Sequence, residues 1–588
     1  MSASSHIHKL AALLTAADRR QLCWLSLALF VSSLLEAFGI GLIFPIVLAA
    51  LSPERLVAMF PAAASLLGPL VAPDARGELL MPLLGLLLAF FFAKNIFITA
   101  ISYWRSKFVF DCRTHVSQRL FQTYLRQPYT FHLQRNTAEL AHNISQETIT
   151  FAFEVLAPTV FLLSETLVAM AILGVLFLIQ PAGTLIVIAL FGLAALLAHI
   201  SLHETLARWG KARQHHVMRR IFHMQQALQG IKEIKAYGRE DRFASRFNEH
   251  DAAASRFYKM QDFFAQLPRV WLELFAVTGI LGIVWVLDRQ ATLDDLLPTL
   301  GIFVGAAFRM FPSVNRMFSA MQQLRLGQAT VDTLYRELTT LEPSSETAPL
   351  GLAAPLRLAH GIRFEDVAFR YPNTSMDIVH GITFSIPQGS FVAIIGSSGS
   401  GKSTLLDLLL GLLTPRTGHI LADGRNIQQQ VRAWQDGIGY VAQSTYLTDD
   451  SIAANIAFGI PPDRVDMGRV RRSVELAHLR TWLAELPEGL NTFVGERGVA
   501  ISGGQKQRIG IARALYHSPE VLILDEATSA LDSETERGIL SELMALRGNN
   551  TVIFVTHRKT LLEYCDRVYN VKDGRITEIP SVTPHPEA

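Results

Sequence analysis

The 588-residue sequence contains only three cysteines, Cys23, Cys112 and Cys565, which lie far apart. No two of them form a C-x-x-C pair, so their spacing argues against a zinc cluster and against a disulfide framework. Charge is scarce as well, because 18% of residues are charged, against about 25% in an average soluble domain. The net charge of +2 provides no global basic field, so we expect no nucleic acid among the partners.

Long apolar stretches occupy the first half of the chain. A membrane span needs about 20 mostly apolar residues. Six stretches reach this length: 22–51, 79–103, 152–179, 183–203, 263–287 and 293–320. Met1 to Gln21 lacks the short apolar core of a removable signal, so the first span is expected to stay in the membrane. Residues 1–330 are therefore predicted to form a polytopic α-helical membrane domain with six spanning helices.

Basic residues are concentrated in the two long polar segments between spans two and three and between spans four and five. They are Arg105, Lys107, Arg113, Arg119, Arg126 and Arg135, then Arg208, Lys211, Arg213, Arg219, Arg220, Lys232 and Lys235. Positively charged loops stay on the cytoplasmic side of a membrane. Both loops and the N-terminus are therefore predicted to be cytoplasmic. Each loop is expected to consist of two helical extensions of its spans.

The connection between the first two spans, Ser52 to Glu78, has an apolar face between prolines. This pattern predicts a short helix lying on the outer membrane surface, with an ordinary loop as the alternative.

The composition changes after residue 330. Residues 331–356 are predicted as a linker, and their second part is rich in Pro, Ser, Thr and Ala. In residues 357–579 short β-rich runs alternate with helical stretches, which predicts an α/β domain with parallel strands. The expected strands are 362–369, 382–386, 391–395, 439–441, 521–524 and 551–555. The tail, 580–588, contains three prolines and is predicted to be disordered.

A phosphate-binding loop follows the expected strand 391–395 and precedes a helical stretch. Its residues fit G-x-x-x-x-G-K-[ST] and are Gly396, Ser397, Ser398, Gly399, Ser400, Gly401, Lys402, Ser403 and Thr404. Backbone N–H groups of such a loop surround a phosphate chain, the lysine neutralises the β- and γ-phosphates, and the Ser403 hydroxyl can bind Mg²⁺. The strand and helix on either side favour this interpretation over a Gly/Ser-rich turn. We therefore predict ATP and Mg²⁺ as cofactors.

Two adjacent carboxylates, Asp525 and Glu526, follow the aliphatic run Val521 to Leu524. Acids at the end of a buried strand, in a domain with a phosphate-binding loop, can serve ATP hydrolysis. Asp525 is expected to hold Mg²⁺, and Glu526 to polarise the attacking water.

Residues 501–505 read I-S-G-G-Q and match the signature motif of the ATP-binding cassette (ABC) superfamily, which the chain resembles. Isoleucine stands where the family usually has leucine. The resemblance implies that Ser502, Gly503, Gly504 and Gln505 cap the γ-phosphate of ATP bound to a partner's phosphate loop. A second half-transporter is then required, and an identical chain is the simpler assumption, because this one carries every motif.

The resemblance also implies roles for four further residues. They are Tyr371 stacking on adenine, Gln443 linking Mg²⁺ to the membrane domain, Asp532 in a dimer-contacting loop that starts at Ser529, and His557 sensing the γ-phosphate. An aromatic face, an amide and an imidazole are chemically suited to these tasks.

The order of the parts resembles the exporters of this superfamily, in which six spans precede the ATPase. Residues 494–498, V-G-E-R-G, resemble their specific loop, and segments near 130–139 and 229–241 are expected to be the coupling helices. The implied fold is the type I/IV exporter fold. The implied location is a bacterial inner membrane with the ATPase domain in the cytoplasm.

Charged residues inside the spans bear on the substrate. Lys94, Arg269 and Arg309 suit an anionic head group, whereas Glu36, Glu165 and Glu273 could instead pair with such cations internally. Both interpretations stay open. A looser resemblance to bacterial flippases for lipid-linked oligosaccharides implies an amphipathic anionic lipid as the substrate. The alternatives are a multidrug or peptide exporter and, in another class, an ATP-gated non-transporting channel or regulator.

Overall fold

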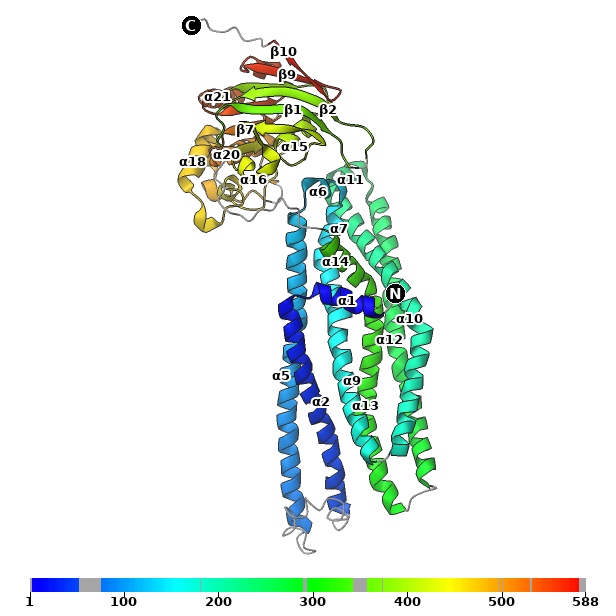
Figure 1. Ribbon diagram of the computed structural model, residues 1–588. Coiled ribbons are helices and arrows are strands. Elements are labelled where there is room, and N and C mark those ends of the chain that lie inside the picture. The colour runs from blue at the N-terminus through cyan, green and yellow to red at the C-terminus, as the bar shows by residue number, and fades with distance from the viewer. Residues whose placement is uncertain are drawn as a thin grey trace. The chain divides into compact units, whose positions relative to one another are not determined.

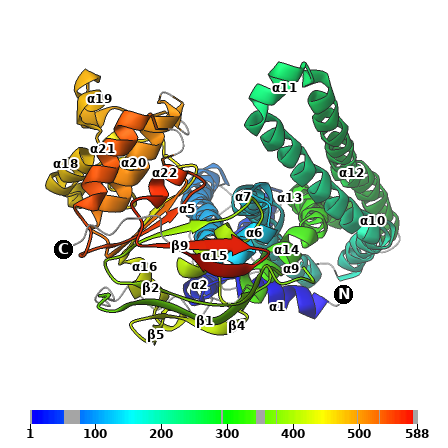
Figure 2. The same ribbon diagram turned by 90° about the horizontal axis from the view of Figure 1, so that it is seen from above.

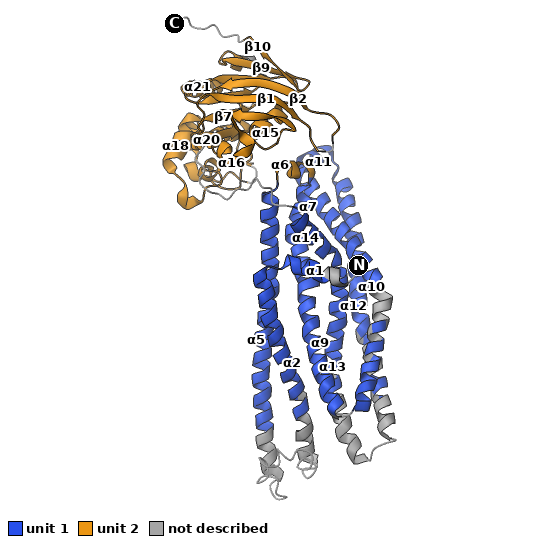
Figure 3. Ribbon diagram, viewed as in Figure 1, with its two compact units in different colours: residues 1–127, 135–343 blue, residues 128–134, 344–588 orange. Residues whose placement is uncertain are grey.

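The computed structural model describes a chain that divides into two compact units (Figure 3). The described residues are 3–51, 76–179, 181–288, 293–341, 357–372, 374–495, 498–499, 501–528 and 531–580. Unit 1 comprises Met1–Gln127 and Arg135–Pro343, and unit 2 comprises Pro128–Gln134 and Ser344–Ala588. The short segment 128–134 thus belongs to unit 2, although it lies in the sequence of the membrane half.

Unit 1 is entirely helical over its described residues (Figure 1). Its long helices are α2 (Ala16–Leu51), α5 (Arg76–Leu125), α9 (Ala157–Ile179), α10 (Pro181–Gln229), α12 (Glu240–Asp288) and α13 (Leu293–Leu326). Its short helices are α1 (Ala3–Leu13), α7 (Thr137–His142), α8 (Thr148–Phe151), α11 (Ile231–Tyr237) and α14 (Gln328–Thr340).

Each predicted span lies in a long helix, the third beginning in the turn just before α9. Over the described residues, three helical stretches are long and apolar enough to cross a membrane: Ala16–Gly39, Leu84–Leu125 and Thr137–Leu178. Helix α5 has 50 residues and is therefore about 75 Å long, whereas the hydrocarbon core is about 30 Å thick. Helices α10 and α12 run beside each other over much of their length (Figure 2). The predicted helical extensions of the spans are therefore present.

Two π-helical turns, η3 (Asn143–Glu147) and η4 (Ala152–Leu156), interrupt the helix that leads into α9. A π turn adds one residue per turn and brings side chains five apart onto one face. His142 and Glu147 consequently meet, with Nε2 of the imidazole 2.9 Å from Oε1 of the carboxylate. Spacing rules for an α-helix do not predict this pair.

The predicted linker needs a correction. Helix α14 occupies 328–340, so the first part of the range 331–356 is helical and packed rather than extended. Its buried residues Thr330, Leu334 and Glu337 recur at helical spacing, and this stripe is what folds it onto unit 1. The second part, 342–356, lies outside the described residues, as do 52–75, where the surface helix is predicted, and the tail 581–588.

Unit 2 contains two sheets. The larger one has six strands in the order β10-β9-β3-β8-β7-β6. Its parallel strands are β6 (Ile438–Val441), β7 (Val521–Asp525), β8 (Thr551–Val555), β3 (Phe391–Ile395) and β9 (Arg567–Lys572), and β10 (Arg575–Ile579) is antiparallel to β9. Strand β7 is buried along its aliphatic run, as the sequence predicts.

The smaller sheet is antiparallel in the order β2-β1-β4-β5. Its strands are β1 (Gly361–Phe369), β2 (Val379–Pro387), β4 (Thr417–Ala422) and β5 (Arg425–Asn426). The sequence predicts strands at β1 and β2, but not at β4 or β5, and it predicts no separate antiparallel sheet.

Unit 2 also contains the helices α15 (Lys402–Leu409), α16 (Val431–Gln435), α17 (Ile452–Ile456), α18 (Met467–Leu476), α19 (Arg480–Glu485), α20 (Gly503–Tyr516), α21 (Ser533–Met544) and α22 (Lys559–Leu562). Two apolar cores form, one containing α15 and the antiparallel sheet, the other containing α18, α20 and α21. The segment 128–134 adds helix α6 (Tyr129–Gln134) to this unit.

Candidate active site

The phosphate-binding loop joins the end of buried strand β3 to the start of α15. The Lys402 ammonium donates to the carbonyl oxygens of Gly396, at 2.8 Å, and Ser397, at 2.9 Å. It therefore closes the loop on itself. Ser400 adds a hydroxyl oxygen that is buried and has no hydrogen-bond partner within the described part of the chain.

Backbone geometry explains the glycine at the start of this loop. Gly396 has a φ of 151°, and an added Cβ would collide with the carbonyl oxygen of Val571. The loop is thus seated against the neighbouring strand β9 at a point where no side chain fits.

The predicted catalytic residues come together at the end of β7. Glu526 Oε2 accepts a hydrogen bond of 2.7 Å from Nε2 of Gln443, and Glu526 Oε1 lies 3.3 Å from Nε2 of His557. These residues follow three different parallel strands, β6, β7 and β8, whose carboxyl ends meet at one edge of the sheet. The structure therefore brings Gln443, Glu526 and His557 to one place.

Electrostatics at this edge suit a metal–phosphate complex. Burial raises the pKa of Asp525, the Glu526 charge raises it further, and Lys402 opposes both. Burial lowers the pKa of Lys402, while Glu526 and Asp525 counteract that effect. A divalent cation would remove the repulsion between the two carboxylates, and phosphate oxygens would satisfy Lys402 and the Ser400 hydroxyl. The residues therefore fit Mg²⁺ and ATP, with Asp525, Gln443 and the exposed Ser403 as the predicted metal-binding set.

Tyr371 lies beside the loop, in two contacts that fix its ring. Its hydroxyl is 3.2 Å from Oγ1 of Thr404, and its ring meets Phe369 edge-on with centroids 5.1 Å apart. The tyrosine therefore lies beside the phosphate loop, and its adenine-stacking role stays a prediction.

Sequence reasoning missed Asp407, which lies on α15 one turn beyond the loop. Burial raises its pKa to about 6, and the charge of Asp525 contributes. The signal was available, since an acid inside the apolar run 405–413 is unusual, but no motif assigns it a role.

Residues of the signature motif form the start of α20. The Ser502 side chain accepts from the backbone N–H of Gln505 at 3.3 Å, and the Gln505 side chain accepts from the backbone N–H of Ser502 at 2.8 Å. This reciprocal capping box leaves Gly503 and Gly504 in the first turn, where N–H groups are not used by the helix. An exposed helix start of this kind favours an anion.

Asp532 has a similar part at the start of α21, where its side chain accepts from the backbone N–H of Thr535 at 2.9 Å. That hydrogen bond lowers the pKa of Asp532. Residues 529–530 and residues 496–497 of the predicted exporter loop lie outside the described residues. The first predicted coupling segment, 130–139, overlaps α6 and the start of α7, and the second, 229–241, contains α11.

Within unit 1 the charged residues in or next to the predicted spans form two clusters. In the first, Arg309 of α13 pairs with Glu36 of α2, with Nε 2.9 Å from Oε2, and the charge of Lys94 of α5 interacts with both. Its charge is one positive unit in excess. The internal pairing that the sequence left open is therefore present for Arg309. The cluster still contains one more cation, Lys94, than carboxylates.

The second cluster repeats this composition. Nε of Arg316 lies 2.7 Å from Oε1 of Glu165, and Arg105 is close to both while its guanidinium carbon lies 3.9 Å from the Phe161 ring centre. Neither Arg105 nor Arg316 belongs to the substrate site that the sequence predicts. The side chain of Arg269 lies outside the described residues, and Glu273 is exposed.

Comparisons with known proteins agree with this architecture. The family model "ABC transporter transmembrane region" matches residues 25–305, and the model "ABC transporter" matches residues 379–529. A solved structure of a bacterial Atm1-family ABC exporter with ATP bound superimposes with a TM-score of 0.76, covering 96% of this chain and 95% of that one. The two sequences are 24% identical, so this likeness concerns the fold.

Several curated relatives carry the name ATP-dependent lipid A-core flippase. One from Photobacterium profundum is 33% identical over 60% of this chain, and the match spans 60% of its own length. One from Alkalilimnicola ehrlichii is 31% identical over 79% of this chain and 78% of its own. One from Cupriavidus metallidurans is 32% identical over 78% and 77%. With both halves matched in the expected order, the chain belongs to the ABC transporter family, as a membrane domain of the exporter fold fused to its ATPase domain.

Proposed function

We propose that two identical copies of this chain use ATP hydrolysis to flip an anionic amphipathic lipid, such as a lipid-linked oligosaccharide, outward across a bacterial inner membrane. Positively charged cytoplasmic loops favour the orientation with the N-terminus and ATPase domain inside. The relatives named ATP-dependent lipid A-core flippase favour a lipid as the substrate.

The observation that carries the substrate class is the excess positive charge of the two clusters. The residues of the first all lie in predicted spans, whereas Arg105 of the second lies just beyond the span 79–103. Isolated charges are expensive in a membrane and are retained for pairing or for function. Glu36 and Glu165 neutralise one cation each, and Lys94 and Arg105 remain as surplus. A phosphate or pyrophosphate group can satisfy both an arginine and a surplus cation through charge-assisted hydrogen bonds.

Hydrolysis follows from the geometry at the end of β7. When bound, the magnesium–ATP complex supplies the phosphoanhydride whose cleavage drives the cycle. Glu526 orients and polarises the attacking water, and its two oxygens are held by Gln443 and His557. Lys402 exchanges its two loop carbonyls for phosphate oxygens. The signature residues Ser502 to Gln505 complete the partner copy's site.

Flipping in proteoliposomes tests this proposal. The probes are a fluorescent polyprenyl-pyrophosphate lipid and, for comparison, a zwitterionic phosphatidylcholine. Lys94→Gln and the charge-neutral pair Glu36→Gln with Arg309→Gln should slow flipping of the anionic probe about tenfold, because each removes charge-assisted bonds to the head group. Lys107→Gln is the matched control, because Lys107 is exposed on the same helix α5.

Four outcomes would contradict the proposal. Unchanged flipping in both charge variants removes the anionic-lipid idea, and equal flipping of the two probes does the same. ATP turnover in wild type no faster than in Glu526→Gln would favour an ATP-gated channel or regulator. Stimulation of turnover by hydrophobic drugs or peptides, but not by the lipid, would favour the other exporter classes.

A further inference from the structure

The chain passes between its two compact units at three points. These are Gln127 to Pro128, Gln134 to Arg135 and Pro343 to Ser344, and the first two enclose helix α6. Any movement of unit 2 that unit 1 follows through the covalent chain must pass through these three connections. Residues of unit 1 that lie next to them are therefore in a position to transmit it.

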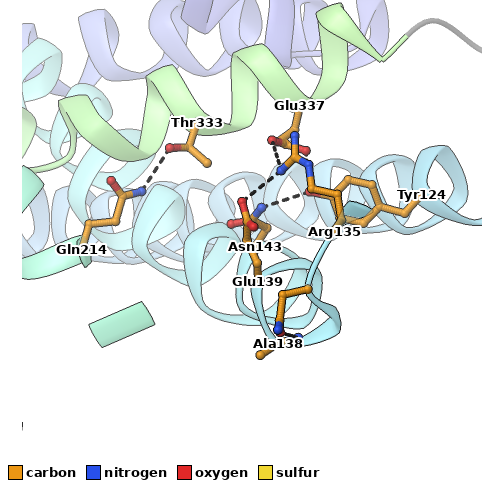
Figure 4. A network of polar contacts seen from close by, with 9 residues as sticks. Tyr124, Arg135, Ala138, Glu139, Asn143, Gln214, Thr333 and Glu337 are labelled. Atoms are coloured by element: carbon orange, nitrogen blue, oxygen red, sulfur yellow. Dashed lines mark hydrogen bonds and ion pairs between the residues drawn. The ribbon is translucent and has the colours of Figure 1, made fainter. Parts of the chain in front are cut away.

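One buried carboxylate joins the unit 1 residues beside all three connections (Figure 4). Glu337, on α14 and 1% exposed, accepts at Oε2 a hydrogen bond of 3.0 Å from the hydroxyl of Tyr124, three residues before the first connection. Its Oε1 accepts a bond of 3.3 Å from Nη1 of Arg135, which immediately follows the second. Glu337 itself precedes the third connection by six residues.

Further bonds hold this arrangement in place. The Asn143 side-chain amide donates to the Tyr124 hydroxyl at 3.1 Å, and Nη1 of Arg135 also donates to Glu139 Oε1 at 2.9 Å. Asn143 and Tyr124 are buried. Breaking such a network leaves a charge buried without its partner, so its members move together rather than separately.

We propose that Glu337 is a positioning residue that couples the ATPase domain to the membrane helices by fastening both ends of the α6 segment to the helix that leads back to that domain. This role rests on the proposed ATP-driven function in one respect, because it requires that nucleotide binding changes the conformation of unit 1. It does not depend on the substrate.

Other contacts of α14 provide the contrast. Lys9 Nζ lies 2.5 Å from Asp332 Oδ1, and the Gln214 amide donates to the Thr333 hydroxyl at 3.2 Å. Both tie α14 to other helices of unit 1, but neither involves a residue beside the α6 connections. They stabilise the packing of α14 without joining the three crossing points.

Spin-label distances in the full chain test the proposal. Ser255 is exposed on α12, so Ser255→Cys with Cys23→Ser allows labelling, because the other two cysteines are buried. The distance between labels in the dimer is compared without nucleotide and after trapping with ATP and vanadate. Glu337→Gln keeps an acceptor for Tyr124 but removes the charge that binds Arg135, and Tyr124→Phe removes the hydroxyl alone.

In Glu337→Gln we expect ATP turnover within about twofold of the parent, with about half or less of its distance shift, because nucleotide binding and helix movement become uncoupled. Tyr124→Phe should show a smaller loss of the same kind. Asp332→Asn, the matched control on α14, should keep the full shift.

A full shift in Glu337→Gln overturns the proposal. A parallel fall of ATP turnover, distance shift and melting temperature in both Glu337→Gln and Tyr124→Phe also overturns it, because a folding defect then explains the result. Absence of lipid flipping in the parent chain would contradict the proposed substrate and leave this comparison intact.

Discussion

Glu526 has a backbone φ of 47°, which residues other than glycine, asparagine and aspartate rarely adopt. Its backbone N–H donates to the carbonyl of Val555 at 2.9 Å, and the side chain is held by Gln443 and His557. Such strain persists only where surrounding contacts maintain it, and it is concentrated at functional sites. The sequence identifies the acid, but only the fold shows how it is aimed.

Asp407 provides a prediction at the same scale. Its pKa of about 6 lies above the ordinary 3.8, so the folded chain disfavours its charged form. The stability that the folded chain gains from holding Asp407 in its neutral form is fully present below pH 3.8 and is lost as pH rises through about 6. In nucleotide-free protein, Asp407→Asn should therefore stabilise the fold by about 1 kcal/mol above pH 7, after allowance for solvent screening.

Melting temperatures between pH 5 and 8 check this. The difference between Asp407→Asn and wild type should grow with pH and then level off. Asp463→Asn, at an exposed position, should show no such trend. A difference that is the same at every pH would show that the Asp407 charge is not responsible.

At the scale of elements, the junction of α13 and α14 is where the membrane half turns into its connecting helix. Gly327 lies between the two helices at a φ of −75°, which any residue can adopt. An added Cβ would approach Val155 Cγ2 at 2.7 Å and the Glu154 carbonyl oxygen at 3.0 Å. The π turn η4 and the start of α14 are therefore in backbone-level contact.

Gly327→Ala should destabilise the chain by about 1 to 3 kcal/mol, because the added methyl group overfills this contact. Thermal unfolding of the purified protein measures it. Gly230→Ala is the control, since the nearest atom to its added Cβ is the Gln226 carbonyl oxygen at 3.5 Å. Equal stability of the two variants would mean that α14 can move away from η4 without lowering the stability of the folded chain.

At the scale of the whole molecule, each proposed ATP site takes its phosphate loop from one copy and its signature residues from the other. The exposed start of α20, with Gly503 and Gly504 in its first turn, suits that role. Two defects in different chains should then be able to complement each other.

Lys402→Ala and Ser502→Arg should each abolish ATP turnover alone. When the two variants are co-expressed, half of the dimers should be mixed, and each mixed dimer has one site with both parts intact. In the unseparated mixture one quarter of all ATP sites are then intact, so ATP turnover per chain should recover to about one quarter of the wild-type value. Dimers purified through two different tags are all mixed, so their turnover should reach about one half of the wild-type value. No recovery at all would contradict composite sites between identical copies.

Elements whose signal is local can be predicted from the sequence alone. Apolar length predicts the six spans, because a hydrocarbon core has a fixed thickness. The loop 396–404 and the acids after β7 are contiguous motifs, so their chemistry is readable without a fold.

Which distant residues meet is visible in the folded chain and not in the sequence. The fold joined Gln443, Glu526 and His557 across three strands, paired Arg309 with Glu36 across 273 positions, and placed Glu337 between Tyr124 and Arg135. It also turned part of the expected linker into α14. The physical reason is that pairing of buried charges and packing of helices depend on three-dimensional neighbours, which spacing along one chain does not specify.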